Sequence, residues 1–244
     1  MGLIEKIQKD FNLPQEALDI LLRLMATAIP YIDDARDYTH DEREVQKDTV
    51  NWGKWVGKIE HQKNLPICVA QSCEVIARVH TNRNRGFDRH TPDKQADYDA
   101  KGFYDLIKQG DKLPYMAGTA PRNGMKWLKK EGIIEVKPFD GAVFRIDKYW
   151  KCRNLKDTKN ALLATGPVSA CFKCYYSLFR CRGLIEKPKT KEPVFGYHQM
   201  ALTGVTKDSF LGVGSWGEVW GSCGIFQLPF ELYDDYITEA WCGE

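Results

Sequence analysis

The chain has 244 residues, 43% of them hydrophobic and 28% charged, a balance typical of globular rather than disordered or fibrous proteins. Its net charge of +2 gives no electrostatic reason to bind nucleic acid or an anionic membrane. No apolar run approaches the ~18 residues that span a bilayer. Charged residues such as Glu5, Lys6 and Lys9 interrupt any signal-peptide core. We therefore expect a cytoplasmic protein with no nucleic-acid or membrane partner.

The first 46 residues differ from the rest of the chain. Apolar residues recur at helical spacing up to Ile29, and Pro30 follows as a stop signal. The polar stretch 33–47 then indicates a linker or a solvated helix. We divide the chain into an N-terminal amphipathic helix and linker, 1–46, and a main domain, 47–244. The N-terminal part could be a helix packed on its own domain, a pro-segment that covers a cleft, or a docking segment for a protein partner.

Helices are predicted in the first half of the main domain. Residues 66–80 carry an apolar stripe and begin with a proline, which the first helical turn tolerates. Only Phe87 interleaves with the arginines of the polar region 81–112, which is interpreted as a solvated surface rather than a nucleic-acid patch. A further helix is predicted over about 123–131, ending at Gly132.

Strands are predicted after Phe139. Alternation of inward and outward residues begins at Val168, directly after a Gly-Pro turn. Short apolar runs follow at 200–205, 209–213 and 224–228. Helices in the first part and strands in the second indicate an α+β fold with a segregated sheet.

Cys68 is the candidate nucleophile. It lies in the first turn of the predicted helix, where unpaired backbone N–H groups and the helix dipole stabilise a thiolate. Gln62 precedes it by six residues, and its amide could join the Cys68 N–H in donating to a developing oxyanion. Cys73 is the rival nucleophile, but its place on the apolar stripe is better explained by a buried structural thiol.

A cysteine nucleophile needs a histidine that takes and returns its proton. His198 is the candidate because it opens the apolar run 199–205, whereas the other four histidines lie in polar or arginine-rich sequence. The residues alone leave two interpretations open, a catalytic Cys68–His198 pair and a satisfied structural histidine.

Five short motifs follow one another in a characteristic order. They are Val50-Asn51-Trp52 with Gln62 and Cys68-Val69-Ala70, Gly118-Thr119-Ala120-Pro121 ahead of Gly132-Ile133, Gly166-Pro167-Val168, Tyr197-His198, and Ser215-Trp216-Gly217 with Trp220-Gly221. Together they cover about residues 50–230 and resemble papain-like cysteine peptidases. The resemblance implies a papain-like two-lobed fold, in which a helical lobe carries the nucleophile helix and a β-rich lobe carries the catalytic histidine.

The resemblance also implies roles for individual residues. Cys68 would attack the carbonyl carbon, His198 would shuttle the proton, and Gln62 would stabilise the oxyanion. The substrate-binding residues would be Gly118, Thr119, Tyr197 and Trp216.

Two positions depart from the family's pattern. Gly214 stands 16 residues after His198, where the family has the asparagine that orients the imidazole. A backbone carbonyl, Ser215 or a water molecule could substitute, and we expect Gly214→Asn to raise the turnover of a weakened peptidase. Thr119 stands where the family usually has a second glycine, which predicts a narrower cleft and a selective or weak enzyme.

Cys171 and Cys174 form a C-x-x-C pair that needs a separate interpretation. A zinc site would require a fourth ligand beside these residues and Cys181, and the sequence offers no convincing one. A redox pair normally opens a helix, whereas this pair follows a predicted strand. Structural thiols are favoured over a disulfide, a redox pair or a metal site.

The sequence therefore predicts a thiol-dependent peptidase that acts on a peptide or protein and needs no cofactor or metal. Two alternatives remain: a catalytically impaired scaffold that binds proteins, and a thiol acyltransferase or amidase. The divergence suggests a bacterial or bacteriophage branch of the family, and a bacteriophage protein could be a virion component.

Overall fold

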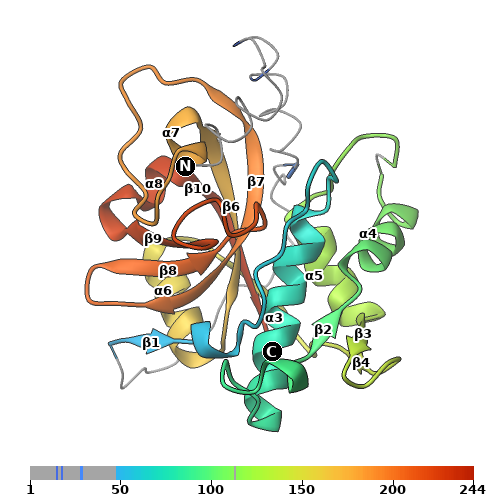
Figure 1. The fold of residues 1–244 in the computed structure, drawn as a ribbon. Coiled ribbons are helices and arrows are strands. Elements are labelled where there is room, and N and C mark those ends of the chain that lie inside the picture. Colours follow the sequence, from blue (N-terminus) through green and yellow to red (C-terminus); the bar gives the residue numbers. More distant parts are fainter. Residues whose placement is uncertain (1–14, 16–17, 19–27, 30–47, 113) are drawn as a thin grey trace.

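The computed structural model describes residues 15, 18, 28, 29, 48–112 and 114–244. A large antiparallel sheet lies on one side of a long helix, and shorter helices with a small sheet lie on the other side (Figure 1). The predicted α+β, two-lobed architecture is confirmed, with helices first and the large sheet second along the chain.

The helices of this part are α3 Cys68–Arg85, α4 Ala100–Gln109, α5 Pro121–Lys130, α6 Leu155–Ala164, α7 Tyr176–Phe179 and α8 Tyr233–Tyr236, with short 3-10 turns at Gly53–Trp55, Pro92–Lys94 and Phe230–Leu232. The strands are β1 Val50–Asn51, β2 Asp97–Tyr98, β3 Ile133–Lys137, β4 Val143–Phe144, β5 Tyr149–Cys152, β6 Val168–Tyr175, β7 Val194–Val205, β8 Ser209–Val213, β9 Ile225–Pro229 and β10 Ile237–Gly243. The large sheet has the order β5-β10-β6-β7-β8-β9, with β1 on β7, and the small sheet has the order β2-β3-β4.

The helix α3 separates two hydrophobic cores. Val75 and Val79 belong to the core of the sheet lobe, whereas Ile76 and Ala77 belong to the core of the helical lobe. A helix buried on both sides has apolar residues around much of its circumference. It ends at Gly86, whose φ of 72° is a left-handed conformation that glycine adopts without strain.

The register of the large sheet places the histidine segment. In the β6–β7 pair His198 lies opposite Phe172, and in the β7–β8 pair Ala201 lies opposite Val213, the last residue of β8. The chain that leaves β8 at 214–216 therefore runs beside His198 and its neighbours in β7.

The interpretation of 81–112 as a solvated surface is wrong for part of that region. Its residues form the end of α3, the strand β2 and the amphipathic helix α4, whose Phe103 and Ile107 are buried in the core of the helical lobe. The error has a physical cause: charged residues on the outer face of α4 mask apolar residues that recur at helical spacing on its inner face.

The predicted helix and linker of 1–46 lie outside the described residues, apart from Gln15, Leu18, Ala28 and Ile29. The division of the chain at residue 46 therefore stays a prediction. Leu18 is buried in the core of the sheet lobe. Among the helices that the structure describes, none is long and apolar enough to cross a membrane.

Candidate active site

Cys68 is the first residue of α3 and is fully buried. The preceding residue, Ile67, makes no side-chain hydrogen bond to the helix end, so no N-cap side chain competes for the first-turn N–H groups. Cys68 packs in a small cluster with Ala28, Val69 and Cys171, against which Tyr197 also rests. The candidate nucleophile thus lies at the junction of α3, β6 and the residue before His198.

Gln62 and Ser215 are joined by two hydrogen bonds. The Gln62 backbone N–H donates to the Ser215 carbonyl at 2.8 Å, and the Ser215 hydroxyl donates to Gln62 Oε1 at 2.7 Å. Gln62 Nε2 donates to the Leu65 carbonyl at 3.1 Å, which fixes the orientation of the amide because a carbonyl can only accept. An amide nitrogen carries two hydrogens, so this bond leaves the second one for an oxyanion.

His198 is fully buried in β7 and its ring plane is set by Trp216. The two rings stack with centroids 4.2 Å apart and 20° between their planes, and Trp216 stacks in turn on Phe179 at 4.9 Å. Ser215 Oγ lies 3.4 Å from His198 Nε2. Trp216 is itself fully buried, and its ring packs against His198, Phe179 and Trp220.

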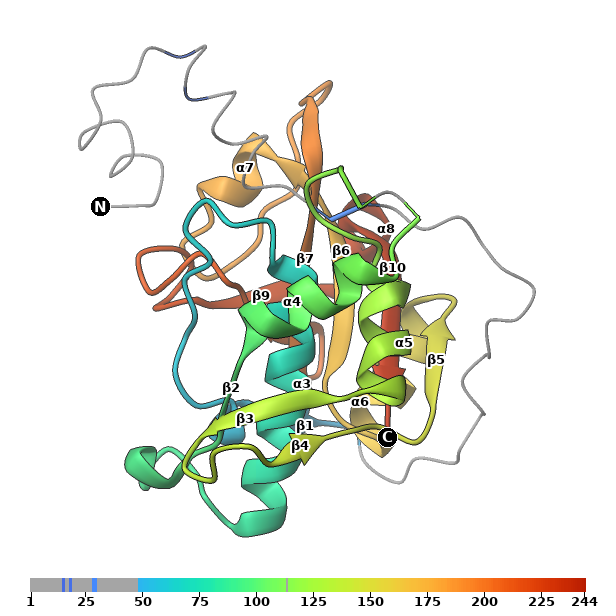
Figure 2. The ribbon, with the colours of Figure 1, turned by 90° about the vertical axis from the view of Figure 1, so that its right-hand side faces the viewer.

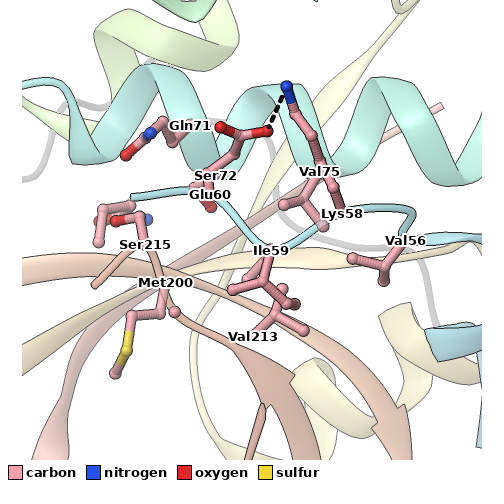
Figure 3. A pocket seen from close by; sticks show the side chains of 13 residues that line it. Val56, Lys58, Ile59, Glu60, Gln71, Ser72, Val75, Met200, Val213 and Ser215 are labelled. Carbon is pink, nitrogen blue, oxygen red and sulfur yellow. Dashed lines mark ion pairs between the residues drawn. The ribbon is translucent and has the colours of Figure 1, made fainter. Parts of the chain in front are cut away.

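Gly214 occupies a position with no room for a side chain. A β-carbon there would lie 2.6 Å from Cζ3 of Trp220 and 3.4 Å from the sulfur of Met200. The Trp220 indole is fully buried and anchored, because its Nε1 donates to the Leu178 carbonyl at 2.9 Å. Figure 3 shows Met200 and Ser215 along one side of a small cavity, whose opposite side is lined by Gln71, Ser72 and Val75 of α3.

The predicted substrate edge is engaged by the chain itself. The Ala28 N–H donates to the Tyr197 carbonyl at 2.7 Å, and the Ile29 N–H donates to the Thr119 carbonyl at 3.2 Å. Ala28 pairs with Thr119 as a parallel β-bridge. In Figure 2 residues 28–29 appear as a short blue piece beside the loop before α5.

The loop that carries Gly118 and Thr119 is held from the helical lobe. The Gly118 N–H donates to the Tyr104 hydroxyl at 3.2 Å, and Lys108 Nζ donates to the Gly118 carbonyl at 3.0 Å. The Thr119 hydroxyl donates to Asp111 at 2.9 Å, which leaves the Thr119 carbonyl as the group that meets residues 28–29.

The buried thiols of Cys73, Cys171 and Cys174 are chemically quiet. Burial raises the pKa of the Cys73 thiol to about 12, which leaves almost no thiolate at neutral pH. Burial also raises the pKa values of Cys171 and Cys174. No disulfide links any of the eight cysteines, all of which lie in the described part of the chain. These observations agree with the interpretation of Cys171 and Cys174 as structural thiols.

One cluster of carboxylates, Glu60, Glu74 and Asp97, has the spacing of metal ligands. The guanidinium of Arg78 contacts all three, and its Nη1 donates to the Lys58 carbonyl at 2.9 Å. The ion pair of Lys58 with Glu60 is drawn in Figure 3. Because cations of the protein already occupy the centre and edge of the cluster, we interpret it as an ion-pair network that ties the segment before Gln62 to α3.

The structure brings together most of the predicted site residues. Gln62 and His198 meet through Ser215, and Thr119 and Tyr197 face each other across residues 28–29. Sequence reasoning did not find the contribution of Ala28, which carries no local signal because it acts through contacts with distant parts of the chain. It included Trp220 in a motif but did not find the contact by which the ring closes position 214.

The chain resembles cysteine proteases in structure far more clearly than in sequence. No family model matches it. An uncharacterised peptidase C1-like protein of Acanthamoeba polyphaga mimivirus is 26% identical over a match that covers 49% of each chain, so the match spans about half the length of that relative.

Solved structures match over most of the chain. Xylellain, a cysteine protease from Xylella fastidiosa, is 17% identical with a TM-score of 0.76, covering 90% of this chain and 96% of xylellain. Procathepsin B S9 from Trypanosoma congolense is 14% identical with a TM-score of 0.71, covering 92% and 88%. Procathepsin L 3 of the Tenebrio molitor larval midgut is 14% identical with a TM-score of 0.69, covering 95% and 79%. The chain therefore has the fold of the papain-like cysteine proteases, which it resembles at only 14–17% sequence identity.

Proposed function

We propose that this protein is a thiol-dependent peptidase. The observation that carries the proposal is what lies beside Cys68: the backbone of residues 28–29 donates hydrogen bonds to the Tyr197 and Thr119 carbonyls, and Ala28 packs in one cluster with Cys68. A site whose carbonyls accept hydrogen bonds from the N–H groups of one peptide backbone is suited to bind another backbone in the same way. The solved structures with the same fold are named as cysteine proteases or their proforms, which supports the same activity.

The proposed reaction follows from the chemistry of the residues. The Cys68 thiol transfers its proton to His198 and its sulfur attacks the peptide carbonyl carbon. The Cys68 N–H and the Gln62 amide donate to the oxyanion that forms. The intermediate collapses to a thioester as His198 returns the proton to the leaving amine. Water then hydrolyses the thioester, with His198 acting as its base.

We further propose that the N-terminal part acts as a pro-segment. Cys68 is fully buried, and Ala28 belongs to the cluster that encloses it. A substrate and residues 28–29 would compete for the Tyr197 and Thr119 carbonyls. The peptidase would therefore be suppressed until residues 28–29 leave the cleft.

Replacing Ala28 with proline tests this pro-segment. Proline has no N–H, so Ala28→Pro removes the bond to the Tyr197 carbonyl. Loss of one such bond corresponds to roughly a 3- to 10-fold shift toward the open cleft, and we expect alkylation of Cys68 to accelerate by that factor. Ile29→Val is the matched control, because it keeps its N–H and should leave the rate unchanged. Equal rates in Ala28→Pro and the wild type would show that residues 28–29 do not limit access.

The peptidase itself is tested with an epoxide-type thiol inhibitor and a peptide library. Cys68 should react faster than Cys223, an exposed cysteine that serves as the internal reference. His198→Ala should lower the alkylation rate of Cys68 to that of Cys223. Cys68→Ala should abolish hydrolysis. Reaction of Cys68 no faster than Cys223, once Ala28→Pro has opened the cleft, would instead favour a scaffold that binds proteins. Transfer of the acyl group to an added amine in preference to water would identify an acyltransferase.

A further inference from the structure

The asparagine position of the papain pattern is closed by packing in this chain. Trp220 lies where a side chain on Gly214 would have to begin, and it packs edge-on against Trp216 with centroids 5.1 Å apart. Trp216 in turn stacks on His198. A group that orients the imidazole must therefore come from another residue.

The hydroxyl of Ser215 has the required position and polarity. Its proton goes to Gln62 Oε1, because that oxygen, 2.7 Å away, can only accept. The remaining lone pairs of Oγ are then directed to other partners, and His198 Nε2 lies 3.4 Å away. Catalytic hydrogen bonds are often this long before substrate binds. A lone pair that faces Nε2 favours a proton on that nitrogen.

Resting on the function proposed above, we propose that Ser215 is the positioning residue for His198, in place of the missing asparagine. Its oxygen accepts the Nε2–H hydrogen bond and leaves Nδ1 as the basic nitrogen. When the Cys68 thiol ionises, its proton moves to Nδ1 and the imidazolium keeps its Nε2–H on Ser215. The Ser215 hydroxyl then connects the imidazole of His198 with Gln62, whose amide is the proposed oxyanion donor.

The imidazole of His198 is oriented although residue 214 has no side chain. The Trp216 ring fixes the plane of the imidazole, and Ser215 fixes which nitrogen carries the proton. Orientation by a stacked indole and a serine hydroxyl together replaces orientation by an asparagine side chain.

The tautomer of His198 tests the proposal directly in the full-length protein. Nitrogen-15 NMR of the imidazoles distinguishes Nε2–H from Nδ1–H, and the loss of one signal set in His198→Gln assigns it. We expect Nε2–H in the wild type and in Ser215→Thr, which keeps the hydroxyl. Ser215→Ala should give a mixture of the two tautomers. An Nδ1–H tautomer in the wild type, or an unchanged signal in Ser215→Ala, would overturn the proposal.

Kinetics provide a second readout. In Ser215→Ala the imidazolium of His198 loses a hydrogen-bond acceptor. The pKa that governs the alkaline limb of the Cys68 alkylation rate should therefore fall by about one pH unit, which is a tenfold change in the protonation equilibrium. We expect kcat for peptides to fall by roughly 10- to 100-fold with KM changed less than about 3-fold. Ser209→Ala is the matched control, because Ser209 is also a buried serine with hydroxyl hydrogen bonds but lies at the start of β8.

The two proposals fail in different ways. If the protein has no peptidase activity but His198 is the Nε2–H tautomer and depends on Ser215, only the proposed function is wrong. If Cys68 is reactive but Ser215→Ala changes neither the tautomer of His198 nor the pH profile of alkylation, only the role proposed for Ser215 is wrong.

Discussion

A side chain at position 214 would collide with an aromatic ring that cannot easily move. The β-carbon of an introduced residue would meet Trp220 at 2.6 Å, and the Trp220 ring is held by its bond to the Leu178 carbonyl and by Phe226 at 5.7 Å between centroids. The expectation from sequence, that Gly214→Asn restores a missing catalytic group, does not take this contact into account.

We therefore predict that Gly214→Asn lowers stability by about 1–3 kcal/mol, as overpacking in a buried site usually does, and does not raise turnover. Chemical denaturation and peptide hydrolysis would measure the two effects. In a Trp220→Leu background the same substitution should be less damaging, because the smaller side chain leaves room. Additive losses in the double variant, or a gain in turnover from Gly214→Asn alone, would contradict the prediction.

His80 is a mostly buried histidine on α3, twelve residues after Cys68. Its Nε2 is buried without a hydrogen-bond partner among the described residues, and its ring stacks on Phe144 at 5.9 Å. Burial lowers the pKa of His80, the nearby Arg83 also lowers it and Glu244 opposes them, which together bring the pKa to about 4. The folded protein therefore keeps this imidazole neutral across the mildly acidic range.

This neutrality predicts a pH-dependent loss of stability. Between pH 6.5, the ordinary pKa, and about pH 4 the unfolded chain binds a proton at His80 that the folded chain does not. Lowering the pH through this window should reduce the free energy of unfolding by about 3 kcal/mol through this residue. His80→Gln cannot titrate, so the difference in stability between the wild type and this variant should change by that amount between pH 7 and pH 4. A constant difference would exclude His80 as the cause.

At the scale of elements, local patterns predicted those segments whose burial follows from their own sequence. The expected strand over 209–213 coincides with β8, and the helix expected from Pro66 begins at Cys68 and continues to Arg85. The helix α4 was missed although Phe103 and Ile107 recur at helical spacing, because the whole of 81–112 was interpreted by its charge. The strand β10 was missed because its pairing with β5 and β6 depends on partners far away in the chain.

The ion-pair network around Arg78 joins α3 to two other segments. Its guanidinium, buried to 1% exposure, faces Glu74 on α3, Glu60 in the segment before Gln62, and Asp97 in β2. Burial raises the pKa of Glu74, Arg78 lowers it, and the carboxylates of Glu60 and Asp97 raise it, which together bring the pKa to about 8. One cation therefore faces three neighbouring acidic side chains, of which Glu74 is still largely protonated at pH 7.

Removing that cation should destabilise the protein most strongly at neutral and higher pH. We predict that Arg78→Met lowers the free energy of unfolding by about 3–5 kcal/mol at pH 7, because buried carboxylates lose their partner. Without Arg78 their pKa values rise in the folded state, so the folded variant takes up protons as the pH falls and the deficit shrinks toward pH 5. Urea titrations at several pH values would measure both effects.

The matched control for Arg78→Met is Lys101→Met. Lys101 and Asp105 also form an i,i+4 ion pair on a helix, but both side chains are more than half exposed. Exposed pairs contribute ~0–1 kcal/mol, and we expect a loss within that range with little dependence on pH. Equal losses from the two substitutions would contradict a special role for the buried network.

At the scale of the whole molecule, the order of motifs predicted the papain-like fold, and it named residues that the fold then brings close together. Gln62 and Ser215 are 153 positions apart and share two hydrogen bonds. From the sequence, Ser215 was only one of three possible substitutes for the asparagine, and the closure of position 214 by Trp220 was not expected. Packing and the direction of a hydroxyl are not encoded in sequence spacing.

The two lobes are also joined by the strand β10. Its alternate residues enter different cores: Ala240 and Cys242 belong to the sheet lobe, and Trp241 belongs to the helical lobe. Trp241 is fully buried, donates from Nε1 to Glu239 at 2.8 Å and packs against Tyr149. A strand with residues in both cores couples the packing of one lobe to the packing of the other.

We therefore predict that Trp241→Ala lowers the free energy of unfolding by about 3–5 kcal/mol, the range for deletion of a large buried side chain, and that unfolding stays a single transition. Circular dichroism, which reports the sheet and helices together, and fluorescence of the other tryptophans should give the same urea midpoint. Ile225→Ala, at a side chain 47% exposed, should change stability by less than about 0.5 kcal/mol. Separate midpoints for the two probes in Trp241→Ala would mean that the lobes unfold independently and that β10 does not couple them.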